Sequence, residues 1–246
     1  MESPDELARY ELTRRRLRDA LAGQLPVCAD IESTLTAYAY WVCTAVHKRG
    51  ADWETTLREY IGRALRDAAR ETEAEQREFA LLRRALCAVP GRGPVLDVGA
   101  GWGRLAALYD ELSLRAVYVE PAGLGLRLMR RNHLGQIVRS VGEALPFPSA
   151  MFPAVLIGWV LHHHSPNFDA AGILREVARV LVAGGWLFSI EPLGAGFDIE
   201  DWRGLLTQPE VGFELCDTQE FFQMPNARGE IERYTLMTGR IAATKR

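Results

Sequence analysis

The segment Val95–Arg104 constrains the fold most, because an apolar run leads there into closely spaced glycines. Its first four residues suit a short, buried parallel strand. Gly99, Gly101 and Gly103 permit a tight turn in which the backbone can approach a ligand closely. Residues 105–108 suit a helix start, whose free N–H groups favour polar or anionic groups. The order predicts a nucleotide-binding unit of strand, turn and helix, and a glycine turn with only a structural role is the alternative.

The spacing of the glycines separates two classes of nucleotide ligand. A dinucleotide-binding turn has the pattern Gly-x-Gly-x-x-Gly, which requires a glycine where this chain has Arg104. The chain instead reads Asp97-x-Gly99-x-Gly101-x-Gly103. This pattern resembles motif I of the class I S-adenosylmethionine (SAM)-dependent methyltransferases. The resemblance implies that SAM is the cofactor and that it is bound at Asp97, Gly99, Ala100, Gly101 and Gly103.

Composition narrows the setting in which the chain acts. Its 246 residues suffice for one α/β core and a modest additional region. A formal charge of -3 gives no general attraction to nucleic acid or to anionic lipid. The longest apolar stretch, Ala154–Leu161, is too short for a bilayer, and the first residues lack a signal-peptide pattern. The four cysteines form no Cys-x-x-Cys pair. We expect a cytoplasmic protein with no nucleic-acid or membrane partner, and a homodimer is left open.

The first ninety residues have helical periodicity. Ser3–Glu6 has the pattern of a capping box at the start of a helix. Further helices are expected over about 30–47, from Asp52, and over about 75–89. The charged stretch 70–77 is expected to be a solvated face or a helix junction. We predict a helical cap or lid over residues 1–90 and a SAM-binding domain over residues 91–246.

From residue 95 onward, strands and helices alternate, which predicts a parallel sheet with right-handed crossovers. Strands are expected at 95–98, 116–119, 136–140, 154–158 and 186–190, and helices at 103–112, 122–133 and 169–181. The resemblance implies a final antiparallel hairpin at the sheet edge, from segments near 213–216 and 234–243. The predicted fold class is therefore α/β, with a Rossmann-like, doubly wound, mostly parallel seven-stranded sheet and an N-terminal helical cap.

An acid, Glu120, ends the second expected strand, 23 positions after Asp97. This is close to the spacing at which an acid reaches the ribose hydroxyls in nucleotide-binding units. The two oxygens of one carboxylate match two adjacent hydroxyls. A solvated or helix-capping acid is the alternative. Together with the glycine turn, Glu120 and the following Pro121 are predicted to lie at the cofactor.

The segment Ser140–Pro148 resembles the Gly-Asp-Ala-Glu-x-Leu-Pro-Phe segment of the ubiquinone/menaquinone-type methyltransferases, where it borders the adenine. The resemblance implies that backbone groups of Gly142, Glu143 and Ala144 contact the adenine. Val141 replaces the aspartate that accepts from the adenine amino group in that family, so its side chain offers only an apolar wall. Gly158, at the end of the fourth expected strand, completes the predicted cofactor set.

Two later segments resemble blocks of the same family, so that the resemblance covers about residues 79–192. Val160–Asn167 resembles its Leu-His-His block, and residues 173–192 resemble its Leu-x-Glu-x-x-Arg-x-Leu-x-x-Gly-Gly block. The side chains of three consecutive histidines diverge, so we expect no metal site. His163 or His162 is the candidate general base, with a role in holding the loop as the alternative. Glu191, at the end of the fifth strand, is a second candidate for the base or for substrate contact, or it holds the following loop.

The predicted function is methyl transfer from SAM to an oxygen, nitrogen or carbon atom of a small, apolar or aromatic molecule. Aromatic residues of the N-terminal helices are expected to cover the substrate, with packing in a helical core as the alternative: Tyr38, Tyr40, Trp41 and Trp53. Two other functions stay open. One is a catalytically silent subunit that binds SAM or S-adenosylhomocysteine (SAH), motivated by Val141. The other is an NAD(P)-dependent oxidoreductase, which Arg104 and the lack of a hydride-transfer constellation disfavour.

Overall fold

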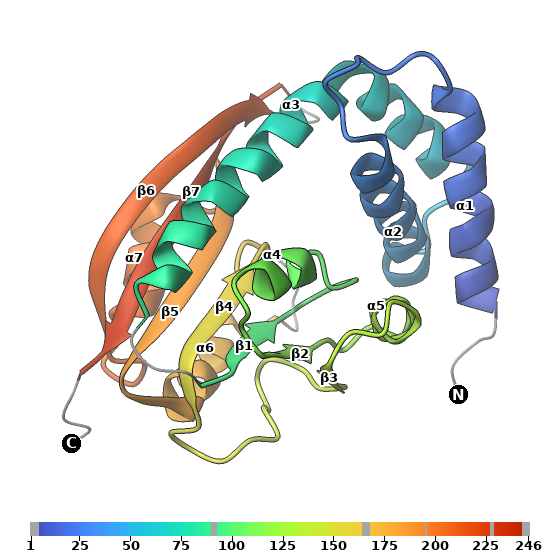
Figure 1. Cartoon of the computed structure of the whole chain (residues 1–246). Coiled ribbons are helices and arrows are strands. Elements are labelled where there is room, and N and C mark those ends of the chain that lie inside the picture. The colour runs from blue at the N-terminus through green and yellow to red at the C-terminus, as the bar shows by residue number, and fades with distance from the viewer. Residues whose placement is uncertain (1–4, 90–92, 164–167, 195, 227–228, 243–246) are drawn as a thin grey trace. The chain divides into compact units, whose positions relative to one another are not determined.

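The computed structural model describes residues 5–89, 93–163, 168–194, 196–226 and 229–242 (Figure 1). Its contacts divide the chain into two compact units, Met1–Arg77 and Glu78–Arg246. Within the described residues, no helix has both the length and the apolar character needed to cross a membrane. The sequence-based division at residue 90 stays a prediction of where the SAM-binding domain begins.

The first unit is helical. It contains α1 (Asp5–Leu21), α2 (Ile31–Arg49) and the first part of α3 (Trp53–Cys87). Asp30 caps α2, because its carboxylate accepts from the Ser33 N–H at 3.0 Å, as expected for a helix that starts there. Asp52 caps α3 through the Thr55 N–H at 2.8 Å. The start of the predicted capping box, at Ser3, lies outside the described residues.

Helix α3 excludes one of the two expectations for residues 70–77, the helix junction, and leaves the solvated face. The helix runs unbroken from Trp53 to Cys87 and joins what the sequence suggested were two helices. The charged stretch contains neither glycine nor proline, and most of its residues are good helix formers. Its charges also pair along the helix, Arg77 with Glu73 at 2.5 Å and Arg63 with Glu71 at 2.7 Å.

The second unit is built on a seven-stranded sheet with the order β3-β2-β1-β4-β5-β7-β6. The strands are β1 (Val95–Val98), β2 (Ala116–Val119), β3 (Gln136–Val138), β4 (Phe152–Gly158), β5 (Leu181–Leu193), β6 (Phe213–Pro225) and β7 (Ile231–Ile241). The first five pair in parallel, whereas β7 pairs antiparallel with both β5 and β6. The predicted mostly parallel α/β sheet and its final hairpin are confirmed.

Helices cover both faces of this sheet, over two separate buried clusters. The helices are the end of α3, then α4 (Ala106–Glu111), α5 (Gly123–Arg131), α6 (Ala170–Val180) and α7 (Ile199–Leu206). One cluster joins Ile157 to Val177 of α6, and the other joins Leu156 to Leu82 of α3. Alternate residues of β4 thus face opposite layers, as expected for a central strand.

Helix α7 was not predicted. Its N-terminus carries a capping box made by two aspartates, in which Asp198 accepts from the Asp201 N–H at 2.9 Å and Asp201 accepts from the Asp198 N–H at 3.1 Å. Trp202 anchors the helix and is fully buried. The Asp-x-x-Asp spacing before Trp202 was the available signal.

The strand order reverses between β1 and β4. β2 lies on the outer side of β1, and β5 lies on the outer side of β4. In open α/β sheets, ligands bind beyond the carboxyl ends of the strands at such a switch point. Val98 of β1 is in register with Val119 of β2 and Ile157 of β4. The glycine turn, Glu120 and Gly158 each follow one of these positions, so the fold brings them to one edge.

Candidate functional site

The glycine turn after β1 is held tightly by its surroundings. Gly99, Gly101 and Gly103 all have positive φ angles, of 76°, 61° and 81°. The N–H groups of Gly99 and Ala100 both donate to the Val119 carbonyl of β2, at 2.9 and 3.0 Å. Val160, from the loop after β4, packs into the space that a Cβ atom on Gly99 would need. The turn is therefore fixed, and the loop that carries the histidines lies against it.

The Glu120 side chain links the glycine turn to the start of α5. The residue is 5% exposed, and its carboxylate accepts from the Gly101 N–H and the Ala122 N–H, each at 2.8 Å. Gly125 of α5 packs against the Gly101 carbonyl so closely that a side chain there would collide with it. A carboxylate oxygen can accept more than one hydrogen bond. The orientation of Glu120 is therefore fixed while both oxygens retain the chemistry for a ribose diol.

Asp97 is buried below the turn, and burial raises its pKa to about 7. The Tyr109 hydroxyl and the Arg104 guanidinium oppose this shift, and the Glu120 carboxylate adds to it. Asp97 therefore titrates near neutral pH beside the predicted cofactor turn.

Arg104, which stands where a dinucleotide site has glycine, folds toward α3. Its guanidinium donates to the buried Glu78 carboxylate at 2.5 Å and lies 5.9 Å from the centre of the Phe79 ring. Sequence reasoning missed Glu78. The available signal was an acid next to the apolar positions at which α3 packs on the sheet.

The predicted adenine edge is a loop after β3, held by α6. Arg179 donates to the Leu145 and Phe147 carbonyls at 2.9 and 2.8 Å, and Glu176 accepts from the Leu145 N–H at 2.8 Å. The hydrogen bond from Arg179 also lowers the pKa of Glu176. These two residues are the Glu and Arg of the Leu-x-Glu-x-x-Arg block, whose structural role the sequence did not reveal. Val141 is 48% exposed, so the loop presents an apolar surface.

Glu191 and His162 form a pair at the end of β5. The Glu191 side chain is fully buried, and its carboxylate lies 2.7 Å from His162 Nδ1. The same carboxylate accepts from the N–H groups of Val160, Leu161 and His162, at 3.2, 2.9 and 3.3 Å. Glu191 thus holds the loop that follows β4, while the His162 ring stays partly exposed.

Of the other two histidines, the structure describes His163, which contacts two neighbouring rings. The centre of the His163 ring lies 4.3 Å from that of His162 and 6.2 Å from that of Phe168. His164 lies outside the described residues. In the part of the chain that the structure describes, no three His, Cys, Asp or Glu side chains form a group able to hold a metal ion.

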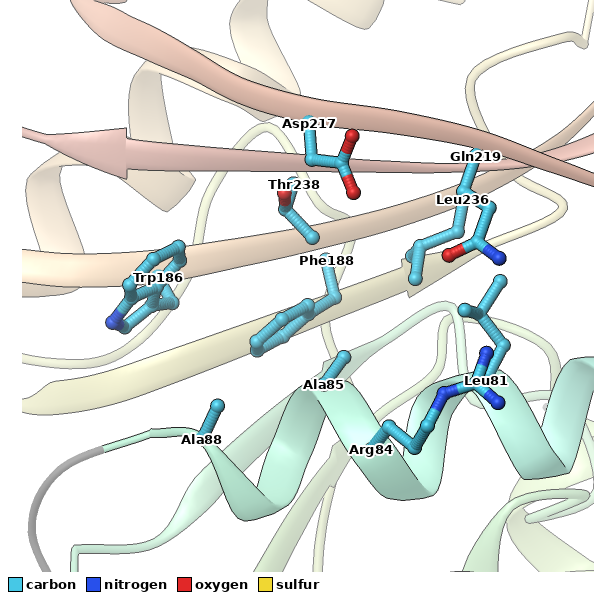
Figure 2. Close-up of a pocket in the computed structure, with 10 residues that line it drawn as sticks. All are labelled: Leu81, Arg84, Ala85, Ala88, Trp186, Phe188, Asp217, Gln219, Leu236 and Thr238. Carbon is cyan, nitrogen blue, oxygen red and sulfur yellow. The ribbon is translucent and has the colours of Figure 1, made fainter.

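The described residues also line an open cavity of about 270 Å³ beside the end of α3 (Figure 2). Its sheet side is formed by Trp186 and Phe188 of β5, whose rings are parallel within 8°. Arg84 of α3 and Asp217 of β6 also line it (Figure 2). None of the predicted catalytic or cofactor residues lines this cavity. The cavity is therefore separate from the edge that the motifs define.

The charges at that edge suit a cationic nucleoside ligand such as SAM. Asp97, Glu78 and Glu120 are buried carboxylates, and Arg104 is the cation that partners one of them. A sulfonium and an ammonium group complement such an acidic edge. Glu120 suits a ribose, and the exposed Val141 suits a flat adenine. The side chains present therefore fit the cofactor that motif I implies.

Comparison with known proteins agrees with this geometry. Residues 96–189 match the family model described as a methyltransferase domain. Uncharacterized proteins of Mycobacterium bovis and Mycobacterium tuberculosis are 38% identical over 94 residues, which is 38% of this chain and 30% of theirs. The match thus spans less than a third of the length of these curated relatives.

Solved structures share the fold at low sequence identity. A putative methyltransferase from Bacillus halodurans has a TM-score of 0.53 at 19% identity, over 66% of this chain and 98% of that one. A SAM-dependent methyltransferase from Methanosarcina mazei has a TM-score of 0.54 at 13% identity, over 65% and 98%. Geranyl diphosphate methyltransferase, solved with its diphosphate ligand and sinefungin, has a TM-score of 0.54 at 14% identity, over 74% and 82%. Residues 96–189 of this chain therefore match a methyltransferase domain, and the chain shares its fold with solved SAM-dependent methyltransferases.

Proposed function

We propose that the chain methylates a small, apolar or aromatic molecule at an atom that loses a proton in the reaction. SAM supplies an electrophilic methyl group. The observation that carries the proposal is the His162–Glu191 pair, next to the glycine turn. Among the oxygen, nitrogen and carbon acceptors that the sequence left open, a protonated oxygen or nitrogen suits this pair best.

The pair has the arrangement of an oriented base. Glu191 is acceptor-only when ionised, so His162 donates its Nδ1 proton to it and Nε2 becomes the basic nitrogen. Three backbone N–H groups hold the Glu191 carboxylate, which keeps the imidazole orientation fixed. We therefore assign His162 as the base that takes the acceptor proton and Glu191 as the residue that positions it. His163 becomes the second candidate.

The cofactor assignments follow the same edge. Glu120 is proposed to bind the ribose, and Gly142, Glu143 and Ala144 the adenine through their backbone groups. Asp97, Gly99, Ala100, Gly101 and Gly103 are proposed to surround the methionine part, with Pro121 and Gly158 at its border. The fixed turn and the buried carboxylates are the features that support this placement.

The helical region 1–90 is proposed to supply the substrate cover. Its aromatic residues do not all serve this purpose, because Tyr38 is fully buried and its hydroxyl donates to Glu71 at 2.5 Å. Burial and the nearby Glu71 carboxylate raise its pKa. Trp41 and Tyr60 are partly exposed and contact Tyr38 at ring-centre distances of 5.4 Å.

Transfer of labelled methyl groups from SAM to a panel of small hydroxyl and amine compounds tests the proposal. His162→Asn is expected to lower kcat by about 100-fold or more, the range for loss of a general base, with SAM affinity retained. The decrease in kcat caused by His162→Asn should be smaller for acceptors of lower pKa, because these acceptors lose their proton more readily. His133→Asn is the matched control, since His133 is exposed and has a positive φ that asparagine tolerates.

Normal turnover by His162→Asn would remove the base from the proposal. Tight SAM binding by the unaltered protein, with no transfer to any acceptor, would favour the catalytically silent subunit.

A further inference from the structure

We propose that Asp97 exchanges a proton for the positive charge of SAM: its carboxyl holds a proton in the free chain below neutral pH and releases it when the sulfonium group binds. This inference rests on the proposed function and adds a dependence on pH to the same site. It starts from the buried charges around the glycine turn. Asp97, Glu78 and Glu120 are 3%, 2% and 5% exposed, and Arg104 is a cation that lies among them.

The three buried carboxylates differ in their partners. Glu120 accepts from two backbone N–H groups, and Glu78 accepts from the Arg104 guanidinium. No N–H group of the described residues donates to the Asp97 carboxyl, which the Tyr109 hydroxyl faces. An ionised carboxylate is unfavourable where it is buried without such a donor, so it takes up a proton or requires a cation. Asp97 is therefore the carboxylate of this edge whose charge depends on a bound cation.

The titratable groups around Asp97 come from the strand beside it, the turn above it and the helices over it: Tyr118 of β2, Glu120, Arg104, Tyr109 of α4 and, through Arg104, Glu78 of α3. On the β4 side its neighbour is Leu156, which does not titrate. Both tyrosines stay neutral, because burial and the nearby Asp97 charge raise the pKa of each, that of Tyr118 to about 12.

The two charged neighbours of Asp97 act in opposite directions. Burial is the largest influence and raises the pKa of Asp97 to about 7, and the Glu120 carboxylate adds to this increase. Arg104 favours the ionised form, but its guanidinium is also hydrogen-bonded to Glu78. The proton on Asp97 is therefore exchanged near neutral pH, where one further positive charge is enough to remove it.

SAM and SAH differ by one methyl group and one positive charge, which lies on sulfur. A cation near a carboxylate lowers the pKa of that carboxylate. SAM therefore favours ionised Asp97, whose proton passes to solvent, whereas the neutral sulfur of SAH leaves Asp97 protonated. Because the SAM complex binds fewer protons than the free chain, the affinity for SAM rises with pH up to about 7 and levels off above it.

The exchange distinguishes the cofactor from its product. Methyl transfer removes the positive charge from sulfur, and Asp97 then takes up a proton from water. Below neutral pH, a proton thus leaves when SAM binds and returns after the transfer. Asp97 stabilises the SAM complex relative to the SAH complex, and this preference increases as the pH rises toward 7.

Calorimetric titration of the full chain with SAM and with SAH, at pH 6.5 in PIPES and in imidazole buffer, tests the exchange. The two buffers differ in their heat of ionisation, so the difference in observed heat gives the number of protons released. The amino groups of both ligands are protonated at this pH. If SAM lowers the pKa of Asp97 from about 7 to about 6, it releases about 0.5 proton and binds about fourfold more tightly at pH 7 than at pH 5.5. SAH should show neither effect.

Asp97→Asn removes the titrating group and keeps the size of the side chain. It should reduce the proton release on SAM binding to that found with SAH, and it should remove the dependence of SAM affinity on pH. His162→Asn and Asp110→Asn are the controls, because His162 belongs to the other titratable pair near the turn and Asp110 is an exposed aspartate of α4. Both variants should retain the release.

Equal proton release by SAM and SAH in the unaltered protein would overturn the inference, whether or not any variant folds. Release that persists in Asp97→Asn, or that disappears in His162→Asn, would overturn it as well. Failure to bind SAM would instead contradict the proposed function.

Discussion

Among single residues, Asp97 gives the clearest dependence on pH. Its carboxyl has a pKa of about 7 in the folded chain and about 3.9 in an unfolded one. Between these values the folded state binds more protons than the unfolded state, so the free energy of unfolding falls as pH rises. The destabilisation is complete above pH 7 and amounts to about 4 kcal/mol.

In Asp97→Asn, the free energy of unfolding is therefore expected to fall less between about pH 4 and pH 7. Above pH 7 the variant is expected to be more stable than the unaltered protein. Urea unfolding at pH 5 and pH 8 measures the difference. Asp19→Asn is the control, since Asp19 is exposed on α1. An unchanged slope in Asp97→Asn would show that this carboxyl titrates normally.

Single residues also show which contacts of the site could not be predicted from the sequence. The glycines and Glu120 were predicted because each directly follows a short apolar strand, β1 or β2, that can be recognised in the sequence. Glu78 was missed because its partner Arg104 lies 26 residues away, a contact that only the folded sheet creates. His162 and Glu191 were each named, but their pairing across 29 residues depends on the register of β4 and β5.

Among the elements, the turn between β1 and α4 has the strictest steric requirement. Gly103 has a φ of 81°, and Leu134 and Met129 occupy the space of any added side chain. Gly103→Ala is therefore expected to lower the free energy of unfolding by about 1 to 3 kcal/mol, from strain and displaced packing. Denaturant unfolding followed by circular dichroism measures this loss.

Gly204→Ala provides the contrasting change. Gly204 lies inside α7, and an added Cβ there would meet no atom within 4 Å. The alanine is expected to stabilise the protein by about 0.5 to 1 kcal/mol through helix propensity. Equal effects of the two substitutions would contradict the steric account of the turn.

The strands were predicted better than the helices, for a physical reason. β1 and β2 match the expected bounds, because buried parallel strands are short apolar runs with clear ends. The bounds of α3 were wrong because a polar surface helix lacks such a signal at residues 70–77. β5 and β6 extend to 13 residues each. Pairing with β7 prolongs β6 and the end of β5, and Leu181 at the start of β5 pairs with Phe152 of β4.

At the scale of the whole molecule, the family match and the second compact unit agree. The matched residues 96–189 lie within Glu78–Arg246 and contain β1 through most of β5. The helical residues before them lie outside the match, so substrate selection by that region stays a proposal. The residues proposed to bind SAM, from Asp97 to Gly158, all lie within the matched region.

Calorimetric titration of the full chain with SAM, SAH and NADH tests this central claim most directly. We expect SAM to bind with a Kd in the micromolar range, about -8 kcal/mol, and NADH not to bind. Glu120→Ala should weaken SAM binding by about 1 to 3 kcal/mol, because ribose hydroxyls lose a buried partner, whereas Glu210→Ala, at an exposed position, should not. Binding of NADH without SAM, or unchanged SAM affinity in a folded Glu120→Ala protein, would contradict the account.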